Sequence, residues 1–174
     1  MSLTVLLGGA RAGKSALALE LARAQGAPVV YVATAEAGDE EMAARIAQHR
    51  TERPETWRTV EEPIALRAAL SAVEPDACVV VDCLTLWVAN LLALGDDVLP
   101  EAEAVAELTG ERRGPTIVVS NEVGLGIVPA SPLGREYRDL LGAVNAAFVR
   151  RANDAAFVVA GRAIPLQPEW RPGA

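Results

Sequence analysis

The sequence predicts an α/β fold in which helices flank a mostly parallel β-sheet, and three features predict it. Short apolar runs rich in β-branched residues recur along the chain with almost no polar alternation, which is typical of strands covered on both faces. Helical patterns lie between these runs. The chain has 174 residues, the length of one domain with a layered core. We therefore expect residues 1–174 to form a single domain.

Five apolar runs are expected to be strands of this sheet. Each is short, as strands usually are, and nearly free of charged residues. The runs are Leu3–Leu7, Val29–Ala33, Cys78–Asp82, Thr116–Ser120 and Ala156–Ala160.

Helical patterns separate the expected strands, and residues that favour helix N-termini mark where several of them begin. The segment Leu99–Gly114 is rich in glutamate and alanine, the composition of a solvated surface helix with its exit turn. The other expected helices are Ala16–Ala22, a helix capped by Asp39, a short helix from Glu62 through Ala69, and a helix from Ser131 to about Asn153.

Composition and charge argue against several functional classes. Hydrophobic residues make up 51% of the chain, but no apolar run reaches the roughly 18 residues that a membrane span needs. The formal net charge of −7 disfavours a nucleic-acid partner, whose phosphates would be repelled. No export signal opens the sequence, so a cytoplasmic location is expected. Cys78 and Cys83 flank one strand on opposite faces, which predicts two buried, unpaired thiols.

The first expected strand leads into the only lysine of the chain, Lys14, within a match to G-x-x-x-x-G-K-[ST]. Every other basic residue among the 16 is arginine. A lysine kept here indicates a need for a compact ammonium between phosphate oxygens. Because a strand precedes the motif and a helix follows it, a phosphate-binding loop is favoured over a chance match. The loop residues are Gly8, Gly9, Ala10, Arg11, Ala12, Gly13, Lys14 and Ser15.

Two residues of this region are candidates for a magnesium site. Ser15 supplies the hydroxyl that the motif normally directs at Mg²⁺. Asp82 ends an apolar strand, where a phosphate-loop enzyme often places the carboxylate that holds the metal. A strand-terminal aspartate also often caps the next helix, a task that nearby Thr85 could perform instead.

His49 is the only histidine of the chain, and Arg45, Arg50 and Arg53 lie around it in the sequence. A lone histidine on a polar helix face is commonly a solvated surface residue. The arginines, however, are suited to triphosphate oxygens, and a neutral imidazole beside a nucleotide phosphate is a potential nucleophile.

Six blocks spread along nearly the whole chain extend these motifs. They are GGARAGKS from Gly8, YVATAEAGDEEMAARIAQHR from Tyr31, RPETWRTVEEP from Arg53, DCLTLWVANLL from Asp82, SNEVGLGIVP from Ser120 and REYRDLLGAVN from Arg135. In these blocks the chain resembles the bifunctional adenosylcobinamide kinase / adenosylcobinamide-phosphate guanylyltransferase family. The His49 block followed by NEVGLGIVP is the specific part of the resemblance. The chain differs from the family pattern at two positions: Ala12 stands where many members have serine, and Ala146 stands where glutamine is usual.

The resemblance implies two reactions. The terminal phosphoryl group of ATP or GTP goes to a hydroxyl of adenosylcobinamide, and GMP then goes from GTP onto adenosylcobinamide phosphate with release of pyrophosphate. The family histidine that forms a guanylyl-histidine intermediate matches His49. The resemblance also implies Mg²⁺ and a homotrimer. Implied nucleotide contacts fall on the phosphate loop, Ala33, Thr34, Ala35, Arg50, Thr51, Glu52, Arg53, Glu61 and Asp82.

Other interpretations of the same residues stay open at this point. A small-molecule kinase would use the phosphate loop without guanylyl transfer, and a nucleotide-switched binding module would use it to report nucleotide state. Glu122, with Gly124 and Gly126, fits a substrate loop or a sharp turn after a strand equally well. Trp57 and Trp87 are expected in the core or at a subunit contact rather than stacked on a ligand.

Overall fold

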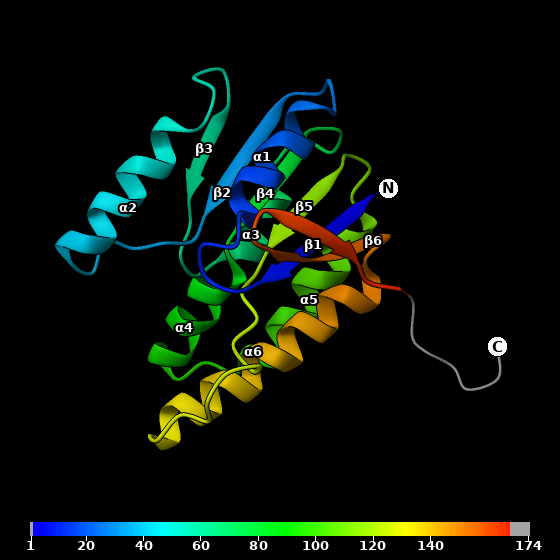
Figure 1. Cartoon of the computed structure of the whole chain (residues 1–174). Coiled ribbons are helices and arrows are strands. Elements are labelled where there is room, and N and C mark those ends of the chain that lie inside the picture. Colours follow the sequence, from blue (N-terminus) through cyan, green and yellow to red (C-terminus); the bar gives the residue numbers. More distant parts are fainter. Residues whose placement is uncertain (1, 168–174) are drawn as a thin grey trace, which may run out of the picture.

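A seven-stranded sheet forms the centre of the structure, in the order β3-β2-β4-β5-β1-β6-β7 (Figure 1). The computed structural model describes residues 2–167; residue 1 and residues 168–174 of the predicted domain lie outside the described residues. All neighbouring strands are parallel except β6 and β7, which confirms the predicted α/β fold. The strands are β1 (Leu3–Gly8), β2 (Val29–Ala33), β3 (Arg58–Glu61), β4 (Cys78–Asp82), β5 (Thr116–Val119), β6 (Asp154–Val159) and β7 (Arg162–Pro165).

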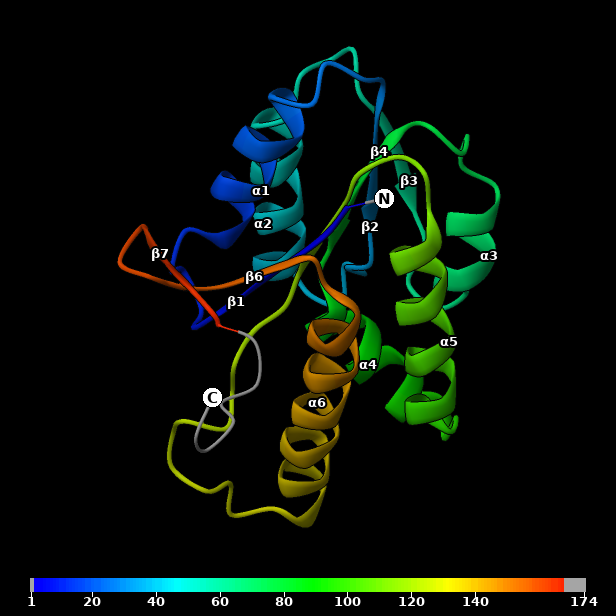
Figure 2. The same ribbon diagram turned by 90° about the vertical axis from the view of Figure 1, so that its right-hand side faces the viewer.

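Helices cover both faces of the sheet (Figure 2). One face packs against α1, whereas the other packs against α3, α4, α5 and α6. None of the helices within residues 2–167 is long and apolar enough to cross a membrane. The helices are α1 (Lys14–Arg23), α2 (Glu40–Thr51), α3 (Leu66–Ser71), α4 (Leu84–Leu94), α5 (Val98–Glu111) and α6 (Pro132–Arg151).

The core explains why the strands show no polar alternation. Along β4, Val79 and Val81 join the cluster under α3 to α6, while Cys78 and Val80 join the cluster under α1. Successive side chains of a strand point to opposite faces, so a strand with helices on both sides has to be apolar at every position. The helix α2 is the exception among the helices, because it contains no buried residue.

The predicted strands and most of the helix starts are confirmed. Asp39 caps α2 by accepting a hydrogen bond of 2.7 Å from the Met42 backbone N–H, and Ser131 caps α6 by accepting one of 3.1 Å from Gly134. The short helix α3 starts later than Glu62, at Leu66. The Glu62 carboxylate accepts hydrogen bonds from the two backbone N–H groups of Ile64 and Ala65, which closes a turn before the helix.

The helix predicted within Leu99–Gly114 is confirmed as α5, but the prediction that it is solvated is wrong. Five residues of α5 are buried against the core. The high alanine content suggested a solvated helix. The buried alanines instead lie, with the buried valines, on an apolar face of α5 that packs against α6 and α3. The buried residues are Val98, Ala102, Val105, Ala106 and Thr109.

Three elements were not predicted, namely β3, α4 and β7. The strand β3 is only four residues long, and β7 is an exposed edge strand, so neither carries a long apolar signal. A tight turn at Ala160 and Gly161, both with positive φ, joins β6 to β7. The prediction that every strand is covered on both faces is wrong for β6, which lies beside this edge strand and is only half-buried. Cys83 is also only partly buried, although both cysteines are free as expected.

We predict that Gly114→Ala destabilises the fold by about 1–3 kcal/mol, because a Cβ there overpacks the backbone. It would lie 2.3 Å from the Ala77 carbonyl oxygen, at the turn that leads into β5. Urea unfolding measures the change. Gly126→Ala is the matched control, since its Cβ would meet nothing within 4 Å. Equal stability of the two variants would contradict the close approach.

Candidate functional site

Three strands end in one row at the carboxyl edge of the sheet. Ala33 at the end of β2 pairs with Glu61 of β3 on one side and with Asp82 of β4 on the other. Val119 of β5 lies beside Asp82. This edge opens into a cavity of about 1180 Å³. The parallel sheet therefore gathers predicted site residues that are far apart in the sequence.

Most of the predicted site residues line this cavity. They come from the phosphate loop, from the ends of β2, β3 and β4, and from the C-terminal half of α2. The lining includes Ala10, Arg11, Ala12, Gly13, Lys14, Ser15, Ala33, Ala35, His49, Arg50, Glu52, Arg53, Glu61 and Asp82.

The phosphate loop owes its shape to glycines with positive φ. Gly8 has a φ of +148°, and a Cβ there would lie 2.2 Å from the Val158 carbonyl oxygen of β6. Gly13, with a φ of 102°, is the residue before α1. The turn between β6 and β7 supports the loop, because the Gly161 backbone N–H donates a 2.9 Å hydrogen bond to the Ala12 carbonyl. A strand–loop–helix unit of this shape binds anions at the helix N-terminus.

Lys14 is held against its own loop. Its Nζ donates hydrogen bonds of 3.0 Å to the Gly8 carbonyl and 2.7 Å to the Gly9 carbonyl, and the residue is only 6% exposed. Burial lowers the pKa of Lys14, while the nearby Cys83 and Asp82 act in the opposite direction. The amine is thus partly desolvated and placed beside a carboxylate.

Asp82 is oriented by a tyrosine that the sequence analysis did not identify. The Tyr31 hydroxyl donates a 2.5 Å hydrogen bond to Asp82 Oδ2, and the Arg53 guanidinium lies 3.6 Å from the centre of the Tyr31 ring. Burial, followed by the charge of Asp82, raises the pKa of Tyr31 far above its usual range, so the hydroxyl stays a donor. The available signal was that Tyr31 is the one hydroxyl in an otherwise aliphatic strand.

The residues present fit a magnesium ion. Asp82 and Ser15 line the same cavity, and a carboxylate with a hydroxyl is a suitable hard donor pair for Mg²⁺. Asp82 is not the cap of α4, because that position belongs to Cys83. The described residues form no cluster of three or more His, Cys, Asp or Glu that could hold a metal. Mg²⁺ commonly takes only one or two protein carboxylates and relies on substrate phosphates and water for its other ligands.

His49 lies near the C-terminus of α2, with its side chain 40% exposed. It lines the same cavity as the phosphate loop, together with Arg45, Arg50 and Arg53, so it is not an isolated surface residue. Its Nδ1 lies 3.2 Å from Glu52 Oε2. The structure therefore places an imidazole, a carboxylate and three guanidinium groups on one wall of the cavity.

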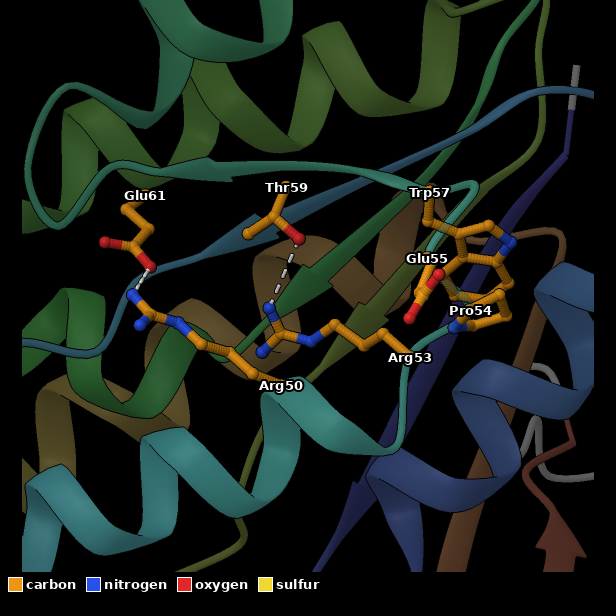
Figure 3. A pocket seen from close by; sticks show the side chains of 7 residues that line it. All are labelled: Arg50, Arg53, Pro54, Glu55, Trp57, Thr59 and Glu61. Carbon is orange, nitrogen blue, oxygen red and sulfur yellow. Dashed lines mark hydrogen bonds and ion pairs between the residues drawn. The ribbon is translucent and has the colours of Figure 1, made fainter.

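A smaller cavity of about 270 Å³ lies between the end of α2 and β3, and Figure 3 shows its side chains. Arg50 forms an ion pair with Glu61, and Arg53 donates a 3.5 Å hydrogen bond to the Thr59 hydroxyl. Both arginines and Glu61 also line the large cavity. Trp57 closes the other end of the small cavity. The two cavities thus share a charged wall.

The remaining predicted site residues lie beside the cavity rather than on its surface. Thr34 is fully buried, and its hydroxyl donates to the Cys83 carbonyl and accepts from the Cys83 N–H, at 2.7 and 2.9 Å. Gly8 and Gly9 present their carbonyls to Lys14. The Thr51 hydroxyl donates to the Gln48 carbonyl. Their contacts with a nucleotide stay predictions.

The other sequence candidates have distinct positions. Trp87 is fully buried, as expected for a core residue. Its Nε1–H donates a 2.8 Å hydrogen bond to the Ile64 carbonyl. The Glu122 carboxylate accepts a 2.5 Å hydrogen bond from the Gly124 N–H, which closes a turn directly after β5. Beyond this turn the loop before α6 runs away from the sheet edge (Figure 2). Asn121 lines the cavity and was not identified from the sequence.

Comparison with known proteins identifies the family. The family model described as "Cobinamide kinase / cobinamide phosphate guanyltransferase" matches residues 4–166. The chain belongs to this family. A "Bifunctional adenosylcobalamin biosynthesis protein CobP" of Pseudomonas aeruginosa is 51% identical over 95% of this chain and 97% of its own length. A "Bifunctional adenosylcobalamin biosynthesis protein CobU" of Escherichia coli is 38% identical over 94% of this chain and 98% of its own.

Solved structures support the fold. The RadB recombinase matches with a TM-score of 0.52 and 20% identity, over 90% of this chain and 73% of that chain. An ATPase from a type III secretion system of pathogenic bacteria matches with a TM-score of 0.54 and 14% identity, over 90% of this chain and 51% of that chain. At this identity the likeness concerns the fold alone.

We predict that Lys14→Arg weakens GTP binding at least about tenfold, because a planar guanidinium cannot take the place of an ammonium enclosed by its loop. Titration calorimetry with GTP and Mg²⁺ measures the affinity. Arg150→Lys, an exchange of the same two residue types on α6, is the control and should bind as the wild type does. Near-normal binding by Lys14→Arg would contradict the role given to the lone lysine.

We also predict that alkylation of Cys83 by iodoacetamide at pH 8 is on the order of a hundredfold slower than that of a free cysteine. Burial and the charge of Asp82 raise the pKa of Cys83 to about 11, so little thiolate is present. GTP should slow the reaction further, because Cys83 lines the cavity. Peptide mass spectrometry gives the rates, with the urea-unfolded chain as the fast control. Labelling as rapid as in that control would contradict the prediction.

Proposed function

We propose that this chain phosphorylates adenosylcobinamide with ATP or GTP, and then transfers GMP from GTP onto adenosylcobinamide phosphate through His49. The observation that carries the proposal is that one cavity is lined by the phosphate loop, by Asp82 and by the only histidine of the chain. The substrates are inferred from the family to which the chain belongs. The cavity supports the proposal by bringing the phosphate loop and His49, the candidate nucleophile, together.

In the first reaction the chain acts mainly by positioning and by neutralising charge. The backbone N–H groups of the loop and the Lys14 ammonium bind the polyphosphate. Asp82, oriented by Tyr31, and the Ser15 hydroxyl would hold Mg²⁺. When bound, the metal supplies charge neutralisation at the phosphates. The substrate hydroxyl displaces the nucleoside diphosphate at the γ-phosphorus.

In the second reaction His49 provides a nucleophile. A direct attack of one phosphate on another brings two anions together, whereas a neutral imidazole nitrogen avoids that repulsion and divides the transfer into two steps. Arg45, Arg50 and Arg53 lie on the same wall of the cavity, where they suit the triphosphate oxygens. The guanylyl group is then passed to the phosphate of the acceptor.

We further place the protein in the cytoplasm as an oligomer, with a trimer as the family arrangement. Two unpaired thiols, one fully buried, suit a reducing compartment. Leu125, Ile127 and Leu133 are 79%, 97% and 62% exposed on the loop and helix start after β5, and subunit association would cover such apolar surface. Light scattering coupled to size-exclusion chromatography measures the oligomeric state.

We predict that incubation with GTP and Mg²⁺ adds one GMP per chain, and that His49→Asn abolishes the adduct but keeps phosphorylation of adenosylcobinamide. Asparagine preserves a polar side chain of similar reach, and the kinase step requires no covalent histidine. Intact mass measures the adduct, and transfer of radiolabelled phosphate from ATP measures the kinase step. Asp82→Asn should lower both activities.

The same measurement separates the proposal from its alternatives. A kinase alone would phosphorylate the acceptor without forming an adduct, and a nucleotide-switched binding module would do neither. An adduct that persists in His49→Asn would show that another residue is the nucleophile. Equal loss of both activities in a well-folded His49→Asn would show that the histidine serves both steps.

A further inference from the structure

The contact between His49 and Glu52 assigns different roles to the two imidazole nitrogens. We propose that Glu52 is a positioning residue that keeps the proton of neutral His49 on Nδ1 and leaves Nε2 as the nucleophilic atom. The proposal rests on the proposed function for the identity of the nucleophile. It adds which atom reacts and which side chain selects that atom.

The geometry holds the carboxylate from two directions. Glu52 Oε2 lies 3.2 Å from His49 Nδ1, and Oε1 accepts a 3.4 Å hydrogen bond from Gln48 Nε2. The backbone of the same residue is also fixed, because Arg23 of α1 donates a 3.0 Å hydrogen bond to the Glu52 carbonyl. Glu52 is the C-terminal cap residue of α2. The backbone of Glu52 is therefore fixed, and its carboxylate lies within reach of the imidazole.

His49 Nδ1 and Glu52 Oε2 are 3.2 Å apart, an ion-pair distance from which a small rotation of the ring forms a hydrogen bond. An ionised carboxylate only accepts hydrogen bonds, so Nδ1 carries the hydrogen in that bond. The hydrogen bond at one imidazole nitrogen sets the state of the other. With the proton on Nδ1, the in-plane lone pair is on Nε2, on the opposite edge of the ring from Glu52. This is the reverse of the tautomer that free histidine prefers in water, which makes the effect of Glu52 measurable.

The covalent step is balanced with this assignment. The Nε2 lone pair attacks the α-phosphorus of GTP, the Nε2–P bond forms, and the bond to the bridging oxygen breaks as pyrophosphate leaves with its electron pair. The ring then carries a positive charge, which the Glu52 carboxylate stabilises through Nδ1–H. When an oxygen of the acceptor phosphate attacks the phosphorus, the P–N bond breaks and its electron pair returns to Nε2.

The alternative is that this contact is an ordinary surface ion pair at a helix end. The two side chains are 40% and 39% exposed, and exposed pairs stabilise folded proteins very little. The two roles predict different results. A surface pair would leave the ring tautomer and the rate of guanylylation unchanged when the carboxylate is removed, whereas a positioning residue would alter both without affecting the fold.

Because His49 is the only histidine, an untagged chain labelled with ¹⁵N in histidine gives one pair of ring-nitrogen signals that needs no assignment. Long-range ¹H–¹⁵N correlation, at a pH where the ring is neutral, should show a protonated Nδ1 and an unprotonated Nε2. Glu52→Ala should shift the ring toward the tautomer with the proton on Nε2. Glu52→Gln should restore the original tautomer in part, because its amide oxygen also accepts a hydrogen bond.

The second measurement locates the bond in the GMP adduct by ³¹P–¹⁵N coupling. Wild type should carry the phosphorus on Nε2, and Glu52→Ala should form the adduct about 10- to 100-fold more slowly, the range found when a metal-binding histidine loses its carboxylate partner. Glu41→Ala is the matched control, since Glu41 lies in the first turn of the same helix and its loss removes the same charge. Urea unfolding verifies that all variants fold.

A proton on Nε2 in the free wild-type chain, phosphorus on Nδ1, or an unchanged tautomer in Glu52→Ala would overturn the inference. If no adduct forms in wild type, the proposed function fails instead. The ring-nitrogen spectrum of the free chain still decides the role of Glu52, because it requires no nucleotide.

Discussion

The parallel register of β2 with β3 and β4 determines how the residues at the ends of these three strands lie relative to one another. Because the three strands end together, Glu61, Ala33 and Asp82 stand side by side, although Ala33 and Asp82 are 49 positions apart in the sequence. Tyr31 lies two residues before the end of β2 on the same face as Asp82, and it reaches that carboxylate directly. A shift of one residue in this register would turn these side chains to the other face of the sheet.

The central strands could be predicted because they are buried on both faces, which leaves a continuous apolar run in the sequence. The phosphate loop could be predicted because its glycines and lysine have fixed spacing. By contrast, β3 and β7 lie at the two edges of the sheet, where one side of each strand has no neighbour and the apolar signal is weak. The burial of α5 was missed because alanine fits either a solvated or a packed helix face.

The site was predictable to the extent that its residues are of chemically distinctive types. Lys14 and His49 are each the only residue of their kind, so the sequence alone indicates them as candidate site residues. Tyr31, Asn121 and the contact between Glu52 and His49 were not predicted. Each of them depends on strand pairing or side-chain direction, which the sequence of a single chain does not specify. The strand order of the sheet then explains why such distant residues line one cavity.

The separation of α2 from the hydrophobic core has a consequence for how the family could diversify. This helix carries His49 and much of the charged wall but contains no buried residue, whereas the phosphate loop is locked between β1 and β6 by close backbone contacts. Substitutions at the exposed positions of α2 are therefore expected to change the free energy of unfolding little, whereas a side chain at Gly8 would overlap the backbone of β6. Under the roles proposed for these residues, selection could vary guanylyl transfer through α2 while the phosphate loop stays constrained by its backbone contacts.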